Sequence, residues 1–141
     1  MSLTLDVAQK IVAGVLAYAK AQNLKPLAVG ILDPRGAIKA FAAQDGTSLK
    51  RGDVAIGKAN GALALGVGTR ALMKRAELQP SFMSAVGAAI GGGLIPVPGG
   101  VLIKQAGVIV GVVGVSGDTS DNDEAAAVAG ITDVGLDADG G

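Results

Sequence analysis

The sequence lacks histidine, cysteine and tryptophan entirely, and its aromatic residues are limited to Tyr18, Phe41 and Phe82. Histidine and cysteine are the commonest catalytic and metal-binding side chains, and this chain has neither. So few aromatic rings also leave no platform on which nucleic-acid bases could stack. Any chemistry must therefore come from carboxylates, lysines, arginines, hydroxyl groups, the single tyrosine and backbone amides.

The chain also lacks an excess of either charge, because 12 Lys and Arg residues balance 12 Asp and Glu residues. Nucleic-acid-binding domains usually carry a basic excess, so no nucleic-acid partner is expected. No basic start followed by an apolar run marks a secretory signal, and we expect a cytoplasmic protein. One uncharged stretch, residues 84–103, contains several glycines with Pro96 and Pro98. Glycine and proline would interrupt a helix here and leave backbone N–H and C=O groups without hydrogen-bond partners inside a bilayer, so no membrane partner is expected.

Apolar residues and glycine are abundant instead. Half of the 141 residues are hydrophobic and 23 are glycine. A chain of this length and composition is expected to form one folded domain with one core. A small domain with so many apolar residues cannot bury all of them in its own core, and some remain exposed on its surface. We therefore expect a homo-oligomer, in which glycines allow close approach between elements or between subunits.

The periodicity predicts an α+β fold. A first helix capped by Thr4 is followed by a hairpin of residues 27–32 and 37–43, whose turn Asp33-Pro34-Arg35-Gly36 has type I chemistry. Helices are expected from Ser48 to about 65, from 69 to 77 and from about 80 to 90. A second hairpin of 101–104 and 108–115 precedes a last helix starting at Ser120 or Asp121. Two hairpins favour one antiparallel sheet packed with helices, in a single domain of residues 1–131 followed by a loose acidic tail of residues 132–141.

Three segments imitate known ligand-binding motifs. Residues 52–59 match a phosphate-binding loop except at Ala59, which stands where that motif has Ser or Thr. Residues 66–71 resemble a dinucleotide-binding fingerprint, but no strand precedes them. The acidic residues between Asp118 and Glu124 do not follow the spacing of a calcium loop. Their position at a helix start is explained by capping and by the helix dipole. We therefore predict helices and helix ends here, and no metal site.

A site for a small anion can nevertheless be assembled from the residues. Strand 108–115 ends in Ser116-Gly117 just before a helix N-terminus, where exposed amides can hold a carboxylate or an enolate oxygen. Lys58 or Arg51 would supply the counter-charge, and Asp123 or Glu124 would act as a general base if burial raised its pKa. This hypothesis makes Lys58, Ser116 and Glu124 catalytic in proton transfer on a small organic acid. Each residue also has a purely structural interpretation, as a solvated helix face, a turn former or a helix cap.

Three segments together resemble the GlcG/HbpS family. They are the loop Gly92-Gly93-Leu94-Ile95-Pro96, the strand and turn of residues 107–117, and the acidic residues 121–124 before an alanine-rich helix. The hairpin of residues 29–36 and the pair Lys58-Ala59 also fit this family of haem-binding or haem-degrading domains. It includes the carboxy-terminal domain of one type of corrinoid adenosyltransferase.

The resemblance implies a profilin-like domain that assembles into hexamers or octamers and binds a small ligand. The ligand pocket would lie between the sheet, the middle helix and the Gly-Gly-x-Pro loop, with Gly93, Ile95, Pro96, Arg51 and Gly117 as binding residues. It also implies binding of haem or a related tetrapyrrole. The cofactor remains unidentified, because histidine and cysteine are absent, and the remaining iron-ligand types are lysines, Tyr18 and the methionines Met1, Met73 and Met83.

Three functions therefore remain open from the sequence. The first is a small-ligand-binding protein of this family, with Tyr18 as a candidate ligand-binding residue. The second is a cofactor-independent isomerase, hydratase or lyase of a catabolic pathway. The third is a non-catalytic oligomeric accessory protein whose glycines pack subunits closely.

Overall fold

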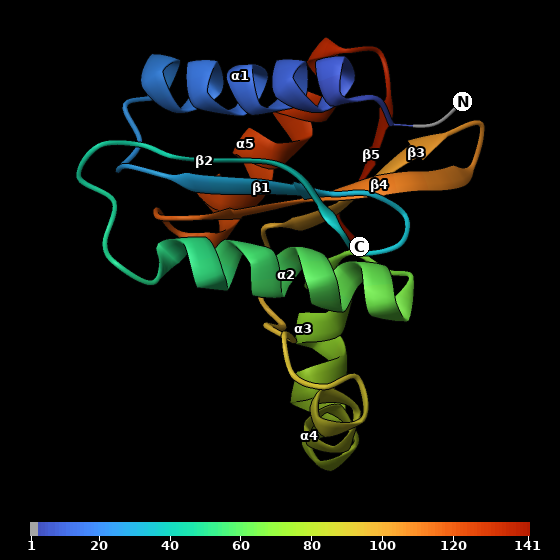
Figure 1. Cartoon of the computed structure of the whole chain (residues 1–141). Helices are drawn as coiled ribbons and strands as arrows, with labels where there is room; N and C mark the ends of the chain where they lie inside the picture. Colours follow the sequence, from blue (N-terminus) through green and yellow to red (C-terminus); the bar gives the residue numbers. More distant parts are fainter. Residues whose placement is uncertain (1–2) are drawn as a thin grey trace.

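The computed structural model describes residues 3–141, which form five helices and five strands in one α+β unit (Figure 1). The predicted order of helix, hairpin, helices, hairpin and helix is confirmed. The elements are α1 (Leu5–Ala21), β1 (Ala28–Leu32), β2 (Ile38–Ala43), α2 (Arg51–Leu65), α3 (Thr69–Leu78), α4 (Pro80–Ala89), β3 (Gly100–Gln105), β4 (Val108–Ser116), α5 (Ser120–Asp133) and β5 (Asp137–Asp139).

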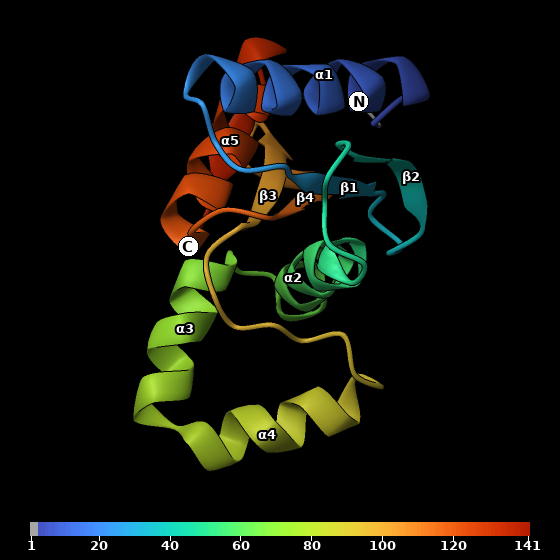
Figure 2. The same cartoon turned by 90° about the vertical axis from the view of Figure 1, so that its left-hand side faces the viewer.

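The two hairpins share one antiparallel sheet with the strand order β2-β1-β4-β3-β5. Helices α1 and α5 cover one face of this sheet and α2 covers the other, while α3 and α4 extend away from the sheet beyond α2 (Figure 2). The larger hydrophobic core lies on the side of α1 and α5, and a smaller one lies under α2. Strand β1 is buried along its whole length because helices cover both of its faces.

Helix α1 begins where its sequence predicts. The Thr4 hydroxyl accepts a hydrogen bond from the Val7 N–H at 3.2 Å, which satisfies one of the free donors of the first turn. The face that α1 buries contains the apolar residues expected from the three- and four-residue spacing, namely Ala8, Ile11, Val15 and Ala19. The helix crosses α5 where Gly14 meets Gly130, and a Cβ on Gly14 would lie 3.1 Å from the Gly130 Cα. These two glycines therefore set how closely the helices pack.

The first hairpin is closed by the aspartate at the start of its turn. One Asp33 carboxylate oxygen accepts hydrogen bonds from the Arg35 N–H at 2.8 Å and the Ala37 N–H at 3.1 Å. Gly36 has φ of 89°, a conformation that glycine adopts without steric cost. The turn chemistry thus determines where β1 ends and β2 begins.

Two helix caps and the C-terminal tail differ from the sequence expectation. Helix α2 begins at Arg51 with no side-chain cap, so Ser48 does not start it. Helix α5 begins at Ser120 as expected, but its cap is Thr119 and not Ser120 or Asp121, because the Thr119 hydroxyl accepts from the Asn122 N–H at 3.2 Å. Residues 132–141, which we expected to be a loose tail, contain the end of α5 and the edge strand β5. Strand β5 pairs with β3 and is held by an ion pair of 2.6 Å between Asp139 and Lys104, a partner distant in sequence.

A buried threonine attaches α3 to the sheet. Thr69 is fully buried, and its hydroxyl oxygen accepts from the Gly100 N–H at 2.8 Å and donates to the Gly100 carbonyl at 3.3 Å. We expect Thr69→Val to lower the free energy of unfolding by about 1–3 kcal/mol, because both backbone groups of Gly100 lose their partner. Urea denaturation measures this change. The exposed hydroxyl of Thr132 bonds only within its own helix, so Thr132→Val is the control with an effect below about 1 kcal/mol. Equal losses in both variants would contradict the role of Thr69.

Candidate functional site

Lys58 projects from α2 into the protein interior and forms a buried ion pair. Its ammonium group donates to the Val115 carbonyl at 2.9 Å and to one Asp123 carboxylate oxygen at 3.0 Å. The other Asp123 oxygen accepts from the Asp118 N–H at 2.9 Å. The Lys58 and Asp123 side chains are only 2% and 1% exposed. The pair therefore joins α2 to the end of β4 and to the first turn of α5, away from solvent.

Burial controls the ionisation of this pair. Desolvation raises the pKa of the Asp123 carboxyl and lowers the pKa of the Lys58 ammonium, in both cases against the attraction of the opposite charge. Removing two charges from water is expensive, and their mutual attraction only partly compensates for it. With its polar atoms already hydrogen-bonded inside the protein, the pair is suited to holding three elements together. The alternative interpretation of Lys58 as part of a solvated helix face is wrong, because its side chain is buried.

Ser116 and Arg51 meet directly beside this ion pair. The Arg51 guanidinium donates to the Ser116 hydroxyl oxygen at 3.2 Å, and Ser116 is fully buried. Gly117 follows with φ of 154°, and a Cβ there would collide with the Pro26 carbonyl oxygen. The amides at this strand end are therefore packed against the segment that leads into β1. The charge of Arg51 contributes to lowering the pKa of Lys58.

Glu124 has a different partner. Its carboxylate lies 3.1 Å from the Arg70 guanidinium, which also reaches Asp121 at 2.6 Å. This network ties the start of α5 to the start of α3. Each of the three residues proposed to be catalytic is thus engaged separately, Lys58 by Asp123, Ser116 by Arg51, and Glu124 by Arg70. The structure does not bring them together around one hollow, and their catalytic role stays a hypothesis.

The Gly93–Pro96 loop lies against α2. Ile95 packs on Gly57, where a Cβ would come within 2.7 Å of the Ile95 side chain, and the Asn60 amide donates to the Gly93 carbonyl at 3.0 Å. After Pro96 the chain turns inward at Gly99, where a Cβ would lie 2.8 Å from the Lys58 ammonium nitrogen. The loop and the Ser116-Gly117 turn are thus separated by packed chain, whereas we expected them to face one another across a ligand.

A hollow does lie on the other side of this loop, between the loop and α4. Its volume is about 390 Å³, and we refer to it as the arm hollow because α3 and α4 form an arm extending from the sheet. Gly93 and Pro96, two of the expected ligand-binding residues, line it. Met83, only 5% exposed, is the buried residue that α4 contributes. The remaining lining residues are Ala76, Pro80, Ser84, Gly87, Gly92 and Leu94, so the wall is almost entirely uncharged and apolar.

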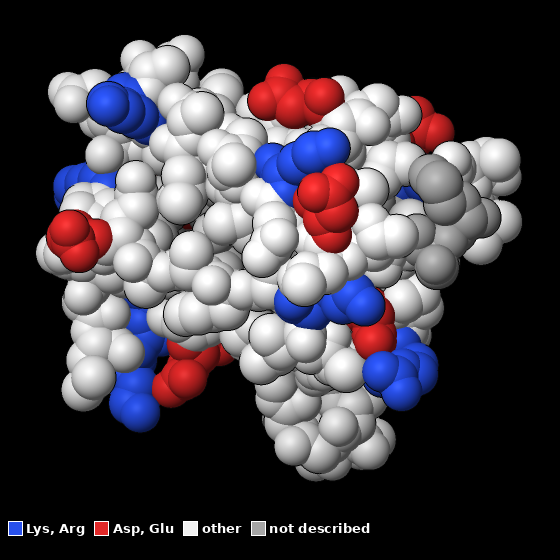
Figure 3. Space-filling view, turned by 45° about the horizontal axis from the view of Figure 1, so that its top comes forward, with Lys and Arg blue, Asp and Glu red and all other residues white. Residues whose placement is uncertain are grey.

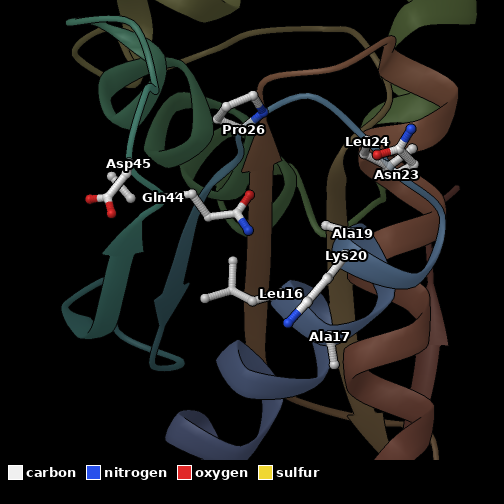
Figure 4. Close-up of a pocket in the computed structure, with 10 residues that line it drawn as sticks. Leu16, Ala17, Ala19, Lys20, Asn23, Leu24, Pro26, Gln44 and Asp45 are labelled. Atoms are coloured by element: carbon white, nitrogen blue, oxygen red, sulfur yellow. The ribbon is translucent and has the colours of Figure 1, made fainter.

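A larger and more open hollow of about 760 Å³ lies beside the C-terminal half of α1 (Figure 4). The Gln44 amide extends between Pro26 and Leu16, with Lys20 and Asp45 on opposite sides. None of the expected ligand-binding residues lines this hollow. Tyr18 is half-buried on α1 and packs against the core, so its ring is part of the core packing.

Of the methionines considered as iron ligands, Met83 lines the arm hollow, Met73 lies half-buried on α3 and Met1 falls outside the described residues. Residues 3–141 hold no group of three acidic side chains arranged to bind a metal ion. In the same part of the chain, no helix combines the length and the apolar character needed to cross a membrane.

The sequence analysis did not identify Asp118 as a residue that organises the site. Its carboxylate accepts from the Asn122 amide and from the Lys25 and Thr119 N–H groups, and these bonds lower its pKa to about 2. The Asp-x-x-x-Asn spacing ahead of a helix was visible as a signal for such a turn. The contact with Lys25, 93 positions away, had no local signal.

Comparison with known proteins supports the resemblance seen in the sequence. A family model described as haem degrading protein HbpS-like matches residues 3–132. No curated protein matches the chain.

Among solved structures, a double mutant of HbpS from Streptomyces reticuli is 26% identical with a TM-score of 0.82, over 96% of this chain and 88% of that chain. The ORFY protein of Klebsiella pneumoniae is 24% identical with a TM-score of 0.83, over 92% and 88%. PduOC, solved as a haem complex, is 20% identical with a TM-score of 0.86, over 96% and 97%. Because the family model covers nearly the whole length, the chain belongs to the HbpS-like family of haem-degrading proteins.

Proposed function

We propose that this protein binds haem or a related flat tetrapyrrole in the arm hollow. The observation that carries the proposal is an apolar hollow of about 390 Å³ built by the family's glycine-proline loop, with the Met83 side chain in its wall. Small-ligand sites are typically mostly apolar hollows of about 300–1,000 Å³. The description of the family as haem-degrading and the haem complex of PduOC support the choice of ligand.

The side chains around the hollow offer haem apolar contacts and a single thioether ligand. Its walls are apolar, as the faces of a porphyrin require, and the Met83 thioether is a known type of axial ligand. The stronger ligands histidine and cysteine are absent from the sequence, and Tyr18 lies in the core packing of α1. Binding would therefore rest mainly on apolar contact with Gly93, Leu94 and Pro96, with one weak bond to iron. Bound haem would supply a redox-active iron, while the chain would supply an apolar wall against the porphyrin.

Haemin titration followed by absorption spectroscopy tests this site. We expect a saturable spectral change at one haemin per chain, and about tenfold weaker binding with an altered Soret band in Met83→Leu. That substitution preserves volume and removes the thioether. Gly87→Leu, which places a side chain in the hollow, should abolish saturable binding. Tyr18→Phe is the control and should titrate like the original chain.

Two results would count against the proposal. Non-saturating uptake by the unmodified chain would remove haem as its ligand. Saturable binding that both Met83→Leu and Gly87→Leu leave unchanged would place the ligand elsewhere, with the hollow of Figure 4 as the next site to test.

A further inference from the structure

Helix α3 begins at a residue that cannot cap it with a side chain. Its N-cap is Gly68, with φ of −64° and ψ of 155°, whereas the hydroxyl groups of Thr4 and Thr119 cap α1 and α5. The first N–H groups of a helix need acceptors from outside the helix. In α3 the Arg70 N–H donates to the Gly140 carbonyl oxygen at 3.1 Å. A backbone carbonyl from a segment distant in sequence thus takes the place of a capping side chain.

The contact between these two segments is so close that it requires glycine. A Cβ on Gly68 would collide with the Gly140 carbonyl group, although the φ and ψ of Gly68 are open to any residue. A Cβ on Gly141 would lie 2.7 Å from the Ala71 backbone nitrogen. Figure 2 shows the C-terminus beside the first turn of α3. The glycine at position 68 is therefore explained by this packing and not by backbone conformation.

Residues 137–141, which we call the strap, are held to the sheet by a short strand and an exposed ion pair. Strand β5 pairs with β3 over three residues. The Lys104 and Asp139 side chains, 2.6 Å apart, are 28% and 39% exposed, and such pairs contribute little to stability. Segments with few buried contacts open at a fraction of the free energy of global unfolding. The strap is therefore suited to leaving the sheet while the core stays folded.

The turn that the strap caps is also the base of the arm formed by α3 and α4. Thr69 bonds to Gly100 of β3, and the Arg70 side chain reaches Glu124 on α5. From this turn the two helices extend away from the sheet (Figure 2). A lost acceptor at this turn therefore acts where the arm is attached to the rest of the fold.

We propose that the strap is a releasable cap of α3, which couples the pairing of β5 with β3 to the order of the arm. With the strap in place, the Gly140 carbonyl satisfies the Arg70 N–H. When β5 leaves the sheet, that N–H must bond to water, and the first turn of α3 opens more often. Because α4 forms one wall of the arm hollow, release should also weaken haemin binding about threefold, the equivalent of one weak hydrogen bond. This last consequence rests on the proposed function, whereas the coupling itself does not.

Hydrogen exchange followed by mass spectrometry tests the coupling from the strap, with no haemin present. Asp139→Lys sets a second cation beside Lys104 and should release the strap. Exchange in residues 70–72 should then rise at least about tenfold, because the cap of α3 is lost. An unchanged exchange rate in residues 70–72 would overturn the inference.

The reverse substitution tests the coupling from the helix. Gly68→Ser places a side chain against Gly140, so exchange in residues 137–141 should rise at least about threefold. In the Asp139→Lys background the same serine should instead slow exchange in residues 70–72, because its hydroxyl can then cap the helix. Equal effects of Gly68→Ser with and without Asp139→Lys would overturn the inference, because the two sites would then be independent.

Two matched controls show whether the effects are specific. Asp6→Lys breaks an exposed ion pair on α1, the helix that Figure 3 brings forward on a mainly uncharged surface with scattered charges of both signs. Gly87→Ser adds the same hydroxyl to α4, where a Cβ would lie 3.6 Å from the Leu94 side chain. Both controls should leave exchange in residues 70–72 and 137–141 within about twofold of the original chain.

The design stays decisive if one variant does not fold. Circular dichroism should show every variant folded. Should Asp139→Lys unfold the chain, Gly68→Ser decides alone, because it lies outside the sheet. Strap exchange that Gly68→Ser leaves unchanged, or that Gly87→Ser raises equally, would overturn the inference. Because these measurements contain no haemin, a failure of haem binding does not alter their outcome.

Discussion

Replacing Lys58 with methionine is expected to lower the free energy of unfolding by about 3–5 kcal/mol, the cost of leaving one member of a buried ion pair uncompensated. Asp123 would keep its charge or take up a proton in a site that is 1% exposed, and the Val115 carbonyl would lose its donor. Both effects act at the junction of α2, β4 and α5. Equilibrium denaturation in urea at neutral pH measures the loss.

A second substitution separates the charge from the packing. Adding Asp123→Asn to Lys58→Met should recover more than half of the lost stability. The amide oxygen can still accept from the Asp118 N–H, and no charge remains buried. The exposed pair Asp6–Lys10 is the control, and Asp6→Asn should change stability by less than about 1 kcal/mol. If Lys58→Met cost no more than this control, the buried pair would not be the support of this junction.

Gly114→Ala is expected to have the second largest effect, about 3 kcal/mol of stability, because α2 lies directly on β4 at this residue. A Cβ on Gly114 would collide with the Ala55 carbonyl oxygen and would lie 2.9 Å from the Ala59 Cβ. Ala55 and Ala59 are themselves fully buried, so the helix would have to move away from the sheet. Thermal and urea unfolding of the variant measure the cost.

A second glycine gives the matched control for this substitution. Gly87, inside α4, has ordinary space around it, since a Cβ would lie 3.6 Å from the Leu94 side chain. Gly87→Ala should therefore be neutral, or stabilising by up to about 1 kcal/mol through helix propensity. If Gly114→Ala were as mild as Gly87→Ala, close contact between α2 and β4 would not explain the glycine in the strand.

The arrangement of α1 and the two hairpins was predictable because their signals are local. The Thr4 cap, the three- and four-residue apolar spacing of α1 and the turn chemistry of Asp33 act within a few residues of the chain. Strand β5 was not predictable in the same way. Its three residues are acidic, and they pair as a strand because the edge of β3 offers backbone partners and Lys104 offers a counter-charge. Neither condition is visible in residues 137–139 themselves.

The candidate site depends even more strongly on contacts between distant segments. Lys58 and Asp123 were both noted in the sequence, but their pairing spans 65 positions and depends on how α2 and α5 dock on the sheet. Local patterns assigned Lys58 to a solvated face, whereas docking buried it. Ser116 contacts Arg51 and Glu124 contacts Arg70 for the same reason. Each arginine lies far from its partner in the sequence and comes beside it only through the packing of the helices on the sheet.

The sequence by itself determined the fold class, the order of the elements, most of their boundaries and the family. Those properties follow from local hydrogen bonding, turn chemistry and apolar periodicity, which act between near neighbours in the chain. Only the tertiary structure decided that Lys58 and Asp123 form a buried ion pair, that a hollow lies between the glycine-proline loop and α4, and that β2 lies at an edge of the sheet. These properties depend on which surfaces become buried when distant segments pack, and burial sets the energy of a charge or a free backbone group.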